Sequence, residues 1–184
     1  MFKILVVASK GGTGKSMLTA SLRDALKDAQ VVDLDPQKTL TISASEGGRP
    51  KPIDPAKATS KFIIYDTPPY HDESIRSMMK SFDAIIIPMK SGISDLIALK
   101  SIYDDLIDTK TIQKSLLVFN EVRKPINNTH KEIVELFKES YPGLRIAKTQ
   151  LSTLLGFNRV LAEPLNGKAL QQIQDLVAEI GFTL

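Results

Sequence analysis

Apolar and polar residues alternate along this chain in blocks that predict a parallel α/β sheet. Six short apolar runs predict strands, and several of them are continuous runs of β-branched residues, as in strands buried on both faces; Ile85-Ile86-Ile87 is the clearest. Between them lie longer stretches with the periodicity of amphipathic helices. Alternating strand and helix signals indicate βαβ construction, a mostly parallel twisted sheet with helices on both faces. The strands are expected at residues 2–7, 30–33, 62–66, 84–88, 116–120 and about 144–148.

Helices are expected between these strands, at residues 15–27, 72–81, 94–107, 129–139 and 167–180. Ser94 is placed to cap the third helix, and four of that helix's apolar residues are expected to face inward: Leu96, Ile97, Leu99 and Ile102. Thr129 and Glu132 have the spacing of a capping box at the start of the fourth helix. Gly181 follows the last helix as a stop signal. Residues 43–60 are rich in Pro, Gly, Lys and Ser and predict an irregular or partly helical connection.

Composition limits the class of protein. With 184 residues, the chain has the length of one α/β domain, taken as residues 1–184, and its hydrophobic fraction of 42% is ordinary for a folded core. No apolar run approaches the roughly 18 residues that span a bilayer, and the N-terminal run is expected to be a first strand rather than a signal peptide. The absence of cysteine excludes disulfides and fits a reducing cytoplasm. The net charge of +3 permits contact with nucleic acid without requiring it.

The most specific chemistry lies in residues 8–16, Ala-Ser-Lys-Gly-Gly-Thr-Gly-Lys-Ser, directly after the first apolar run. A strand that leads into a glycine loop and then a helix forms a phosphate cradle from backbone N–H groups. Lys15 would face the β- and γ-phosphates, and the Ser16 hydroxyl would bind Mg²⁺. The ordinary pattern has glycine where this chain has Ser9, and a second lysine, Lys10, stands at the head of the loop.

The motif Lys-Gly-Gly-Thr-Gly-Lys-Ser resembles the deviant P-loop of the ParA/MinD family of dimeric ATPases. Two further segments extend the resemblance over nearly the whole chain. Residues 31–39, Val-Val-Asp-Leu-Asp-Pro-Gln-Lys-Thr, resemble the ParA branch, and residues 62–69, Phe-Ile-Ile-Tyr-Asp-Thr-Pro-Pro, resemble the Walker B strand and its switch. No helix-turn-helix segment precedes the loop, so the chain resembles the short ParA type.

The resemblance assigns roles to individual residues. Lys10 would reach across a dimer to the partner's ATP; the alternative is a solvated loop lysine. Asp35 would orient the attacking water, and Asp33 would lie near the metal or, alternatively, cap a turn or helix. Asp66 would reach Mg²⁺ through a water molecule. The nucleotide would be held by Gly11, Gly12, Thr13, Gly14, Lys15, Ser16, Met17 and Asn120.

Two of these nucleotide-binding residues need comment. Asn120 ends a strand, and its amide has the donor and acceptor that complement adenine; a turn-forming asparagine is the alternative. Met17 replaces the Thr or Ser usual in the family, so one hydroxyl contact to the α-phosphate would be missing. His71 and His130 lack a metal-ligand pattern. A P-loop kinase is disfavoured because the few arginines are scattered rather than clustered in a lid.

Members of this family differ in the cargo that they position. The C-terminal helix is acidic on its polar face, which predicts a packed helix rather than a membrane anchor. The resemblance therefore implies a cytoplasmic, nucleoid-associated ATPase that uses ATP and Mg²⁺, dimerises, binds DNA without sequence preference and responds to a ParB-like partner. The candidate DNA contacts, which could also be ordinary surface charge, are Arg145, Lys148, Arg159 and Lys168. The alternative is an ATP-gated dimerisation switch that positions a protein cargo, with little hydrolysis and no direct role on DNA.

Overall fold

A parallel sheet in the order β2-β3-β1-β4-β5-β6 forms the centre of the computed structural model, which describes residues 1–184 except 48, 69–72, 124–125, 127 and 182–184. The strands pair only in parallel, as the sequence predicts. Their bounds are β1 Phe2–Val6, β2 Ala29–Asp33, β3 Phe62–Asp66, β4 Ala84–Met89, β5 Ser115–Phe119 and β6 Arg145–Ile146.

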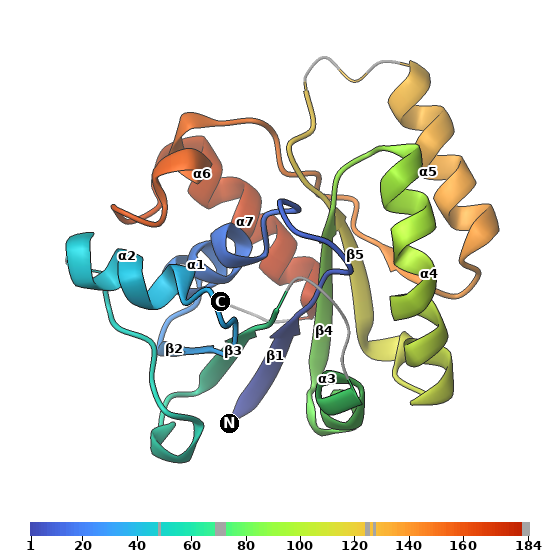
Figure 1. Ribbon diagram of the computed structural model, residues 1–184. Coiled ribbons are helices and arrows are strands. Elements are labelled where there is room, and N and C mark those ends of the chain that lie inside the picture. Colours follow the sequence, from blue (N-terminus) through green and yellow to red (C-terminus); the bar gives the residue numbers. More distant parts are fainter. Residues whose placement is uncertain (48, 69–72, 124–125, 127, 182–184) are drawn as a thin grey trace.

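Helices cover both faces of this sheet (Figure 1). On one side lie α1 (Lys15–Ala25), α2 (Thr39–Gly47), α6 (Leu155–Arg159) and α7 (Gly167–Ile180). On the other side lie α3 (Glu73–Met78), α4 (Ile93–Asp108) and α5 (Asn128–Ser140). Short 3₁₀ turns occur at Pro55–Lys57, Met79–Ser81 and Ile112–Lys114.

The core is two apolar layers separated by the sheet. Successive residues of a strand point to opposite faces, so Ile4 and Ile86 pack with α1 and α7, whereas Leu5 and Ile85 pack with α4 and α5. The central strands are buried on both sides, which is why their sequences are continuously apolar. The C-terminal helix α7 buries Ile173 and Val177 in the first of these layers, as expected of a packed helix.

The structure corrects several boundaries. The last strand is only Arg145–Ile146, an edge strand that pairs with β5 at two positions. The helix expected to reach residue 27 ends at Ala25, since Asp28 takes a positive φ and β2 begins at Ala29. The helix expected over residues 72–81 is α3 followed by a 3₁₀ turn, and Asp72 lies outside the described residues. The segment 43–60, expected to be irregular or partly helical, begins inside α2, which starts earlier, at Thr39.

Two expectations for α4 are wrong in detail. The helix begins at Ile93 after Gly92, and no side chain caps it, so Ser94 lies inside the first turn. Leu99 and Ile102 are buried and Leu96 packs against the same layer, but Ile97 is 70% exposed. A helix buries only one stripe of its surface, and Ile97 lies outside it. The remaining boundaries differ from expectation by one or two residues, within the ordinary fraying of helix and strand ends.

Candidate nucleotide site

The candidate site lies where the carboxyl ends of β1, β2 and β3 meet. Val6 and Asp33 both align with Asp66 in the strand register, so the glycine loop after β1 lies beside two carboxylates. Ligands of open α/β sheets bind at such carboxyl edges. The alignment brings the three sequence motifs into one place although up to 60 residues separate them along the chain.

The glycine loop ends at the beginning of α1. Gly14 is the N-cap residue, has a φ of +93° and provides no side-chain cap. The first backbone N–H groups of α1 therefore remain available, and the helix dipole favours an anion there. A Cβ on Gly14 would lie 2.1 Å from the amide nitrogen of Asn120. Both the backbone angle and this close approach require glycine at position 14.

Asp66 connects α1 to the sheet. The Ser16 hydroxyl donates to Asp66 Oδ2 at 2.6 Å, and Thr19 donates to Oδ1 at 3.3 Å. Burial raises the pKa of Asp66 to about 7, against the opposing effects of the Ser16 hydrogen bond and the Lys15 charge. Sequence analysis missed Thr19, although its place three residues after Ser16 puts both hydroxyls on one helix face.

The buried charges at this edge fit a magnesium nucleotide. Lys15 is 6% exposed; burial lowers its pKa, and the charges of Asp66 and Asp35 oppose this shift. The Ser16 hydroxyl and the Asp66 carboxylate are the oxygen ligands that Mg²⁺ takes, and a cation there would favour ionised Asp66. No group of three or more His, Cys, Asp or Glu among the described residues forms a metal site by itself. Binding of Mg²⁺ at this edge would therefore require phosphate oxygens of a nucleotide as further ligands.

Asp33 and Asp35 organise the turn after β2. Asp33 accepts hydrogen bonds from the Asp35 backbone and from both N and Oγ1 of Thr41, which are the contacts of a turn or capping aspartate. Asp35 is 5% exposed and accepts from the Gln37 backbone at 2.9 Å. The Lys38 ammonium, which sequence analysis did not single out, donates to the Asp33 carbonyl at 2.6 Å.

The Walker B switch is joined to the P-loop strand. Thr67 is fully buried, and its hydroxyl donates to the Val6 carbonyl at 2.9 Å. Pro68 is buried, whereas Pro69 and His71 lie outside the described residues. His130 is buried in α5, and its ring meets Phe119 edge-on at 5.4 Å.

Lys10 is held within its own chain. Its ammonium forms an ion pair with Asp95 Oδ1 at 2.8 Å and donates to Ser94 Oγ at 3.1 Å. The Lys10 side chain is 37% exposed. Asp95 itself is buried in the first turn of α4. Sequence analysis missed Asp95, because only the fold brings residue 95 beside the loop.

Asn120 supports the loop from the opposite side. Its amide donates to the Thr13 carbonyl at 2.9 Å, and its side-chain oxygen accepts from the Glu121 backbone. A cavity of about 320 Å³ adjoins it, where Gly14 and Met17 face residues 152–154, 157, 158 and 161. This wall includes α6, which sequence analysis did not predict because its five residues are too few to show a period.

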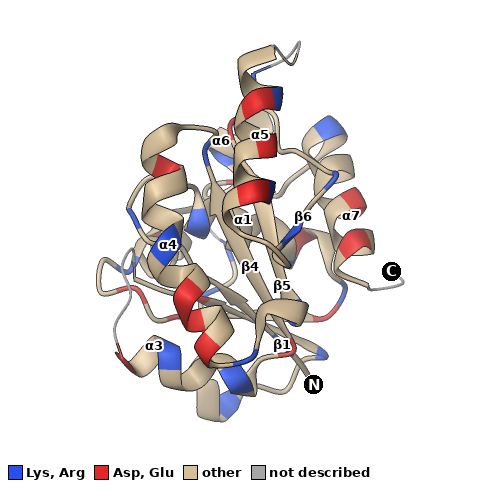
Figure 2. Cartoon of the chain, turned by 90° about the vertical axis from the view of Figure 1, so that its right-hand side faces the viewer, with Lys and Arg blue, Asp and Glu red and all other residues tan. Residues whose placement is uncertain are grey.

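The four candidate DNA contacts do not form one cluster. Arg145 and Lys148 bond the Glu179 region at the end of α7, whereas Lys168 lies in its first turn, about 16 Å away at 1.5 Å per residue. Arg159 lies 3.5 Å from Glu163. Figure 2 shows acidic and basic residues interspersed over α4, α5 and α7.

Comparison with known proteins decides the family. A model of the CobQ/CobB/MinD/ParA nucleotide-binding domain matches residues 4–163, most of the chain. The chain belongs to this family. The predicted resemblance to the ParA/MinD-type ATPases is therefore confirmed, and so is the predicted fold class. No curated protein sequence matches the chain.

Solved structures agree on the fold. A protein of Borrelia burgdorferi B31, named for plasmid partition and bound to AMPPNP, is 18% identical, with 98% of each chain covered and a TM-score of 0.75. McdA of Cyanothece bound to ATP is 14% identical, with 98% of this chain and 96% of that chain covered and a TM-score of 0.74. MinD of Pyrococcus horikoshii with Mg-ADP is 17% identical, with coverage of 98% and 96% and a TM-score of 0.66. No described helix of this ParA/MinD-type chain is long and apolar enough to cross a membrane.

Replacing Gly14 with alanine should abolish nucleotide binding. The new methyl group would meet the Asn120 amide, and the positive φ alone costs about 1–2 kcal/mol for a side-chain-bearing residue. Gly181→Ala is the matched control, because Gly181 also has a positive φ but no described residue lies within 4 Å of its Cβ position. Calorimetry with Mg-AMPPNP and urea unfolding should show both variants destabilised but only Gly14→Ala unable to bind. Wild-type affinity in Gly14→Ala would contradict the assigned loop geometry.

Proposed function

We propose that this protein is an ATP-dependent partition ATPase whose ATP-bound form is a homodimer that binds DNA without sequence preference. The observation that carries the ATPase part is the contact of Ser16 with buried Asp66 next to Lys15. A cation-binding hydroxyl, a strand-end carboxylate and a buried ammonium are the groups that phosphoryl transfer from ATP requires. Hydrolysis is proposed to be slow and to be stimulated by a ParB-like adaptor.

Each residue of the site then has a role. The backbone of residues 11–16 and the Lys15 ammonium would bind the phosphates, and Ser16 and Asp66 would hold Mg²⁺, with Asp33 close by. Asp35 would orient the attacking water, since its buried carboxylate lies in the turn after β2. Met17 and the nearby cavity would receive the base. Asn120 would contribute by holding Thr13, and the second N–H donor of its amide would read adenine.

Dimerisation is proposed to change the partner of Lys10. In the single chain its ammonium neutralises the buried Asp95 carboxylate. In the ATP-bound dimer it would instead face the partner's phosphates, where a lysine supplies charge without the bidentate grip of arginine. Slow turnover would suit a protein that measures time rather than one that processes a metabolite.

A second candidate function does not involve DNA, and the arrangement of surface charge favours it. Arg145, Lys148 and Lys168 lie near the two ends of α7 and Arg159 lies in α6, and the side chains of Arg145 and Arg159 bond carbonyl or acidic groups of the same chain. A protein with this surface could use ATP only as a dimerisation switch that positions a protein cargo. The two proposals share the nucleotide site and differ in whether DNA binds.

Lys15→Ala should lose ATP binding, because it removes the charge that faces the phosphates, whereas Lys10→Ala should bind ATP but lose partner-stimulated hydrolysis and the ATP-bound dimer. Lys90→Ala is the control, since Lys90 is a similarly half-exposed lysine paired with Glu121 at 2.9 Å. Calorimetry, light scattering and phosphate release measure the three properties. Full stimulated turnover in Lys10→Ala would refute the cross-subunit role.

Asp35→Ala should bind Mg-ATP and dimerise but hydrolyse on the order of 10²-fold more slowly, as expected for loss of a group that positions or accepts a proton. Asp54→Ala, at an exposed aspartate that caps only a 3₁₀ turn, is the control. Single-turnover hydrolysis and size-exclusion chromatography separate chemistry from assembly. If Asp35→Ala cannot bind Mg-ATP, Asp35 belongs to the metal site instead.

DNA binding should appear with ATP but not with ADP or without nucleotide, because only a dimer doubles the basic groups on one face. A dimer that contacts several phosphates should show a log–log salt slope of roughly −4 or steeper. Lys148→Glu and Lys168→Glu should weaken binding equally on any sequence, whereas Lys80→Glu, on the other face of the sheet, should not. Fluorescence anisotropy with random duplex DNA measures this. Equal binding in all nucleotide states, or none in any, would favour the protein-cargo switch.

A further inference from the structure

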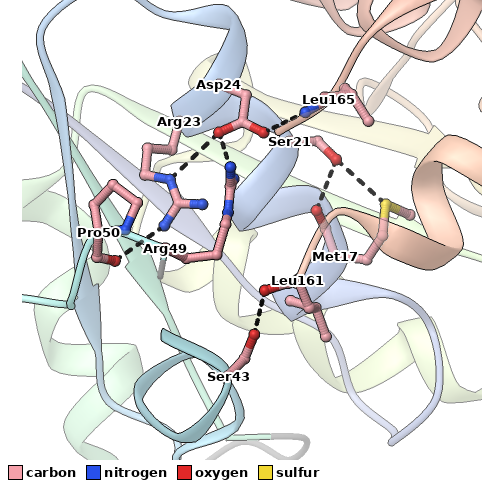
Figure 3. Close-up of polar contacts among 9 residues, drawn as sticks. All are labelled: Met17, Ser21, Arg23, Asp24, Ser43, Arg49, Pro50, Leu161 and Leu165. Carbon is pink, nitrogen blue, oxygen red and sulfur yellow. Dashed lines mark hydrogen bonds and ion pairs between the residues drawn. The ribbon is translucent and has the colours of Figure 1, made fainter. Parts of the chain in front are cut away.

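A second cavity, of about 550 Å³, opens at the end of α1 farthest from the glycine loop. Four segments that are distant in sequence line it: the end of α1 with the start of β2, the end of α2 with Arg49 and Pro50, Ser60, and residues 162–165 before α7. Figure 3 shows Arg23 and Arg49 converging on one carboxylate oxygen of Asp24, with Leu165 at the other oxygen. None of these groups takes part in the nucleotide site described above.

Two guanidinium groups share one carboxylate at this wall. Arg49 Nη2 lies 2.5 Å and Arg23 Nε 3.5 Å from the same oxygen, Asp24 Oδ1. The Arg23 and Arg49 side chains are only 9% and 6% exposed. The second oxygen of Asp24 accepts the Leu165 backbone N–H at 2.8 Å. The cluster therefore holds one more positive than negative charge in a place that water hardly reaches.

The donors of this cluster are not fully used. Arg23 Nη1 reaches the Pro50 carbonyl at 3.3 Å, but Arg49 Nε is buried and has no hydrogen-bond partner among the described residues. Burial, and next the charge of Arg49, lower the pKa of Arg23. Two buried guanidinium groups that share one carboxylate leave an uncompensated charge, which is unfavourable. An anion in the cavity would relieve the repulsion between them.

The other acidic residues on the lining are engaged elsewhere. Asp28 accepts the Lys61 backbone N–H at 2.8 Å, and Glu163 faces Arg159 at 3.5 Å. Asp24 is saturated by the two arginines and Leu165. Asp28 and Glu163 keep their charges but are exposed, so solvent screens them, whereas the arginine pair is buried and its charge is screened less.

We propose that this cavity is a binding site for a small oxyanion, a phosphate- or carboxylate-bearing molecule that lies against Arg23 and Arg49. Guanidinium groups match both kinds of oxyanion by paired N–H donors. The competing interpretation is that Asp24 and the two arginines only fasten α1 to the loops around Pro50 and Leu165. That interpretation accounts for the ion pairs but leaves the surplus positive charge and the cavity without a role.

The position of the site suggests what its occupant would influence. The Ser43 hydroxyl of α2 donates to the Leu161 carbonyl, and a Cβ on Gly47 would lie 3.2 Å from the Ala162 carbonyl. Leu161 lines the smaller cavity beside Met17, while Ala162 lines this one. An anion here would thus contact the same short segment that forms part of the wall proposed to receive the base. Any coupling would be reciprocal between the two ligands.

Titration with inorganic phosphate and, separately, malonate tests the proposal and distinguishes the two sources of oxyanion. The readout is the Nε–H resonances of arginine in a nitrogen–proton NMR spectrum, assigned by substitution. We expect the Arg23 and Arg49 resonances to shift in a saturable way with at least one probe, with a Kd of about the millimolar range. Arg49→Gln should weaken this binding about tenfold or more, and Lys27→Gln, which removes a neighbouring exposed charge outside the lining, should not.

Three results would overturn the proposal. One is the absence of shifts at both arginines up to about 50 mM of either probe, far above a millimolar Kd. Another is binding to Arg49→Gln as tight as to the wild type. The third is a response confined to backbone amides of residues 11–16, which would report the glycine loop alone. Because the wild-type resonances already decide the matter, the test stands even if Arg49→Gln fails to fold.

Discussion

The fully buried carboxylate of Asp66 is the constraint on which the nucleotide site depends. It accepts the hydroxyls of Ser16 and Thr19 from α1 and aligns with Asp33 and Val6 across the sheet. The glycine loop is therefore held between its own strand and a helix that is bonded to the neighbouring strand. Without these contacts a carboxylate in an apolar sheet would be strongly unfavourable. Its raised pKa shows that they compensate the burial only in part.

The elements around this carboxylate differ in how firmly they are tied. Asn120 and Thr67 anchor the loop by bonds to backbone carbonyls, which fix its shape. Lys10 is instead held by side chains of α4 and stays partly exposed. A contact between two side chains can be exchanged without moving the backbone. This difference allows the loop to stay rigid for phosphate binding while its outermost lysine changes partner.

The opposite end of α1 presents a similar chemical situation with the opposite sign. There, the buried guanidinium groups of Arg23 and Arg49 share the carboxylate of Asp24. Beside the loop, the single carboxylate of Asp66 is instead surrounded by hydroxyls and an ammonium group. In both places an incompletely neutralised charge adjoins a cavity or an open loop. Buried ionisable groups with unmet demands often mark functional sites, so a helix of 11 residues would carry a candidate site at each end.

The sequence by itself determined the sheet, the order of strands and helices, and the phosphate cradle. Unbroken β-branched runs such as Ile85-Ile86-Ile87 identify buried strands, and the spacing of Gly14, Lys15 and Ser16 has a direct chemical meaning. These signals are local, so they can be seen without the fold. The short helix α6 escaped because its five residues are too few to show a period, and the strand expected at about residues 144–148 is only the two-residue β6.

Only the tertiary structure decided which distant residues meet. Asp95 beside Lys10, Asn120 beneath Thr13, and Arg49 beside Asp24 are separated by 25 to 107 residues in the chain. Nothing in a local pattern distinguishes a charged residue that will be exposed from one that the packing of helices will bury. The sequence specified the cradle because backbone geometry creates it, whereas the partners of its side chains depend on the packing of helices and loops around the sheet.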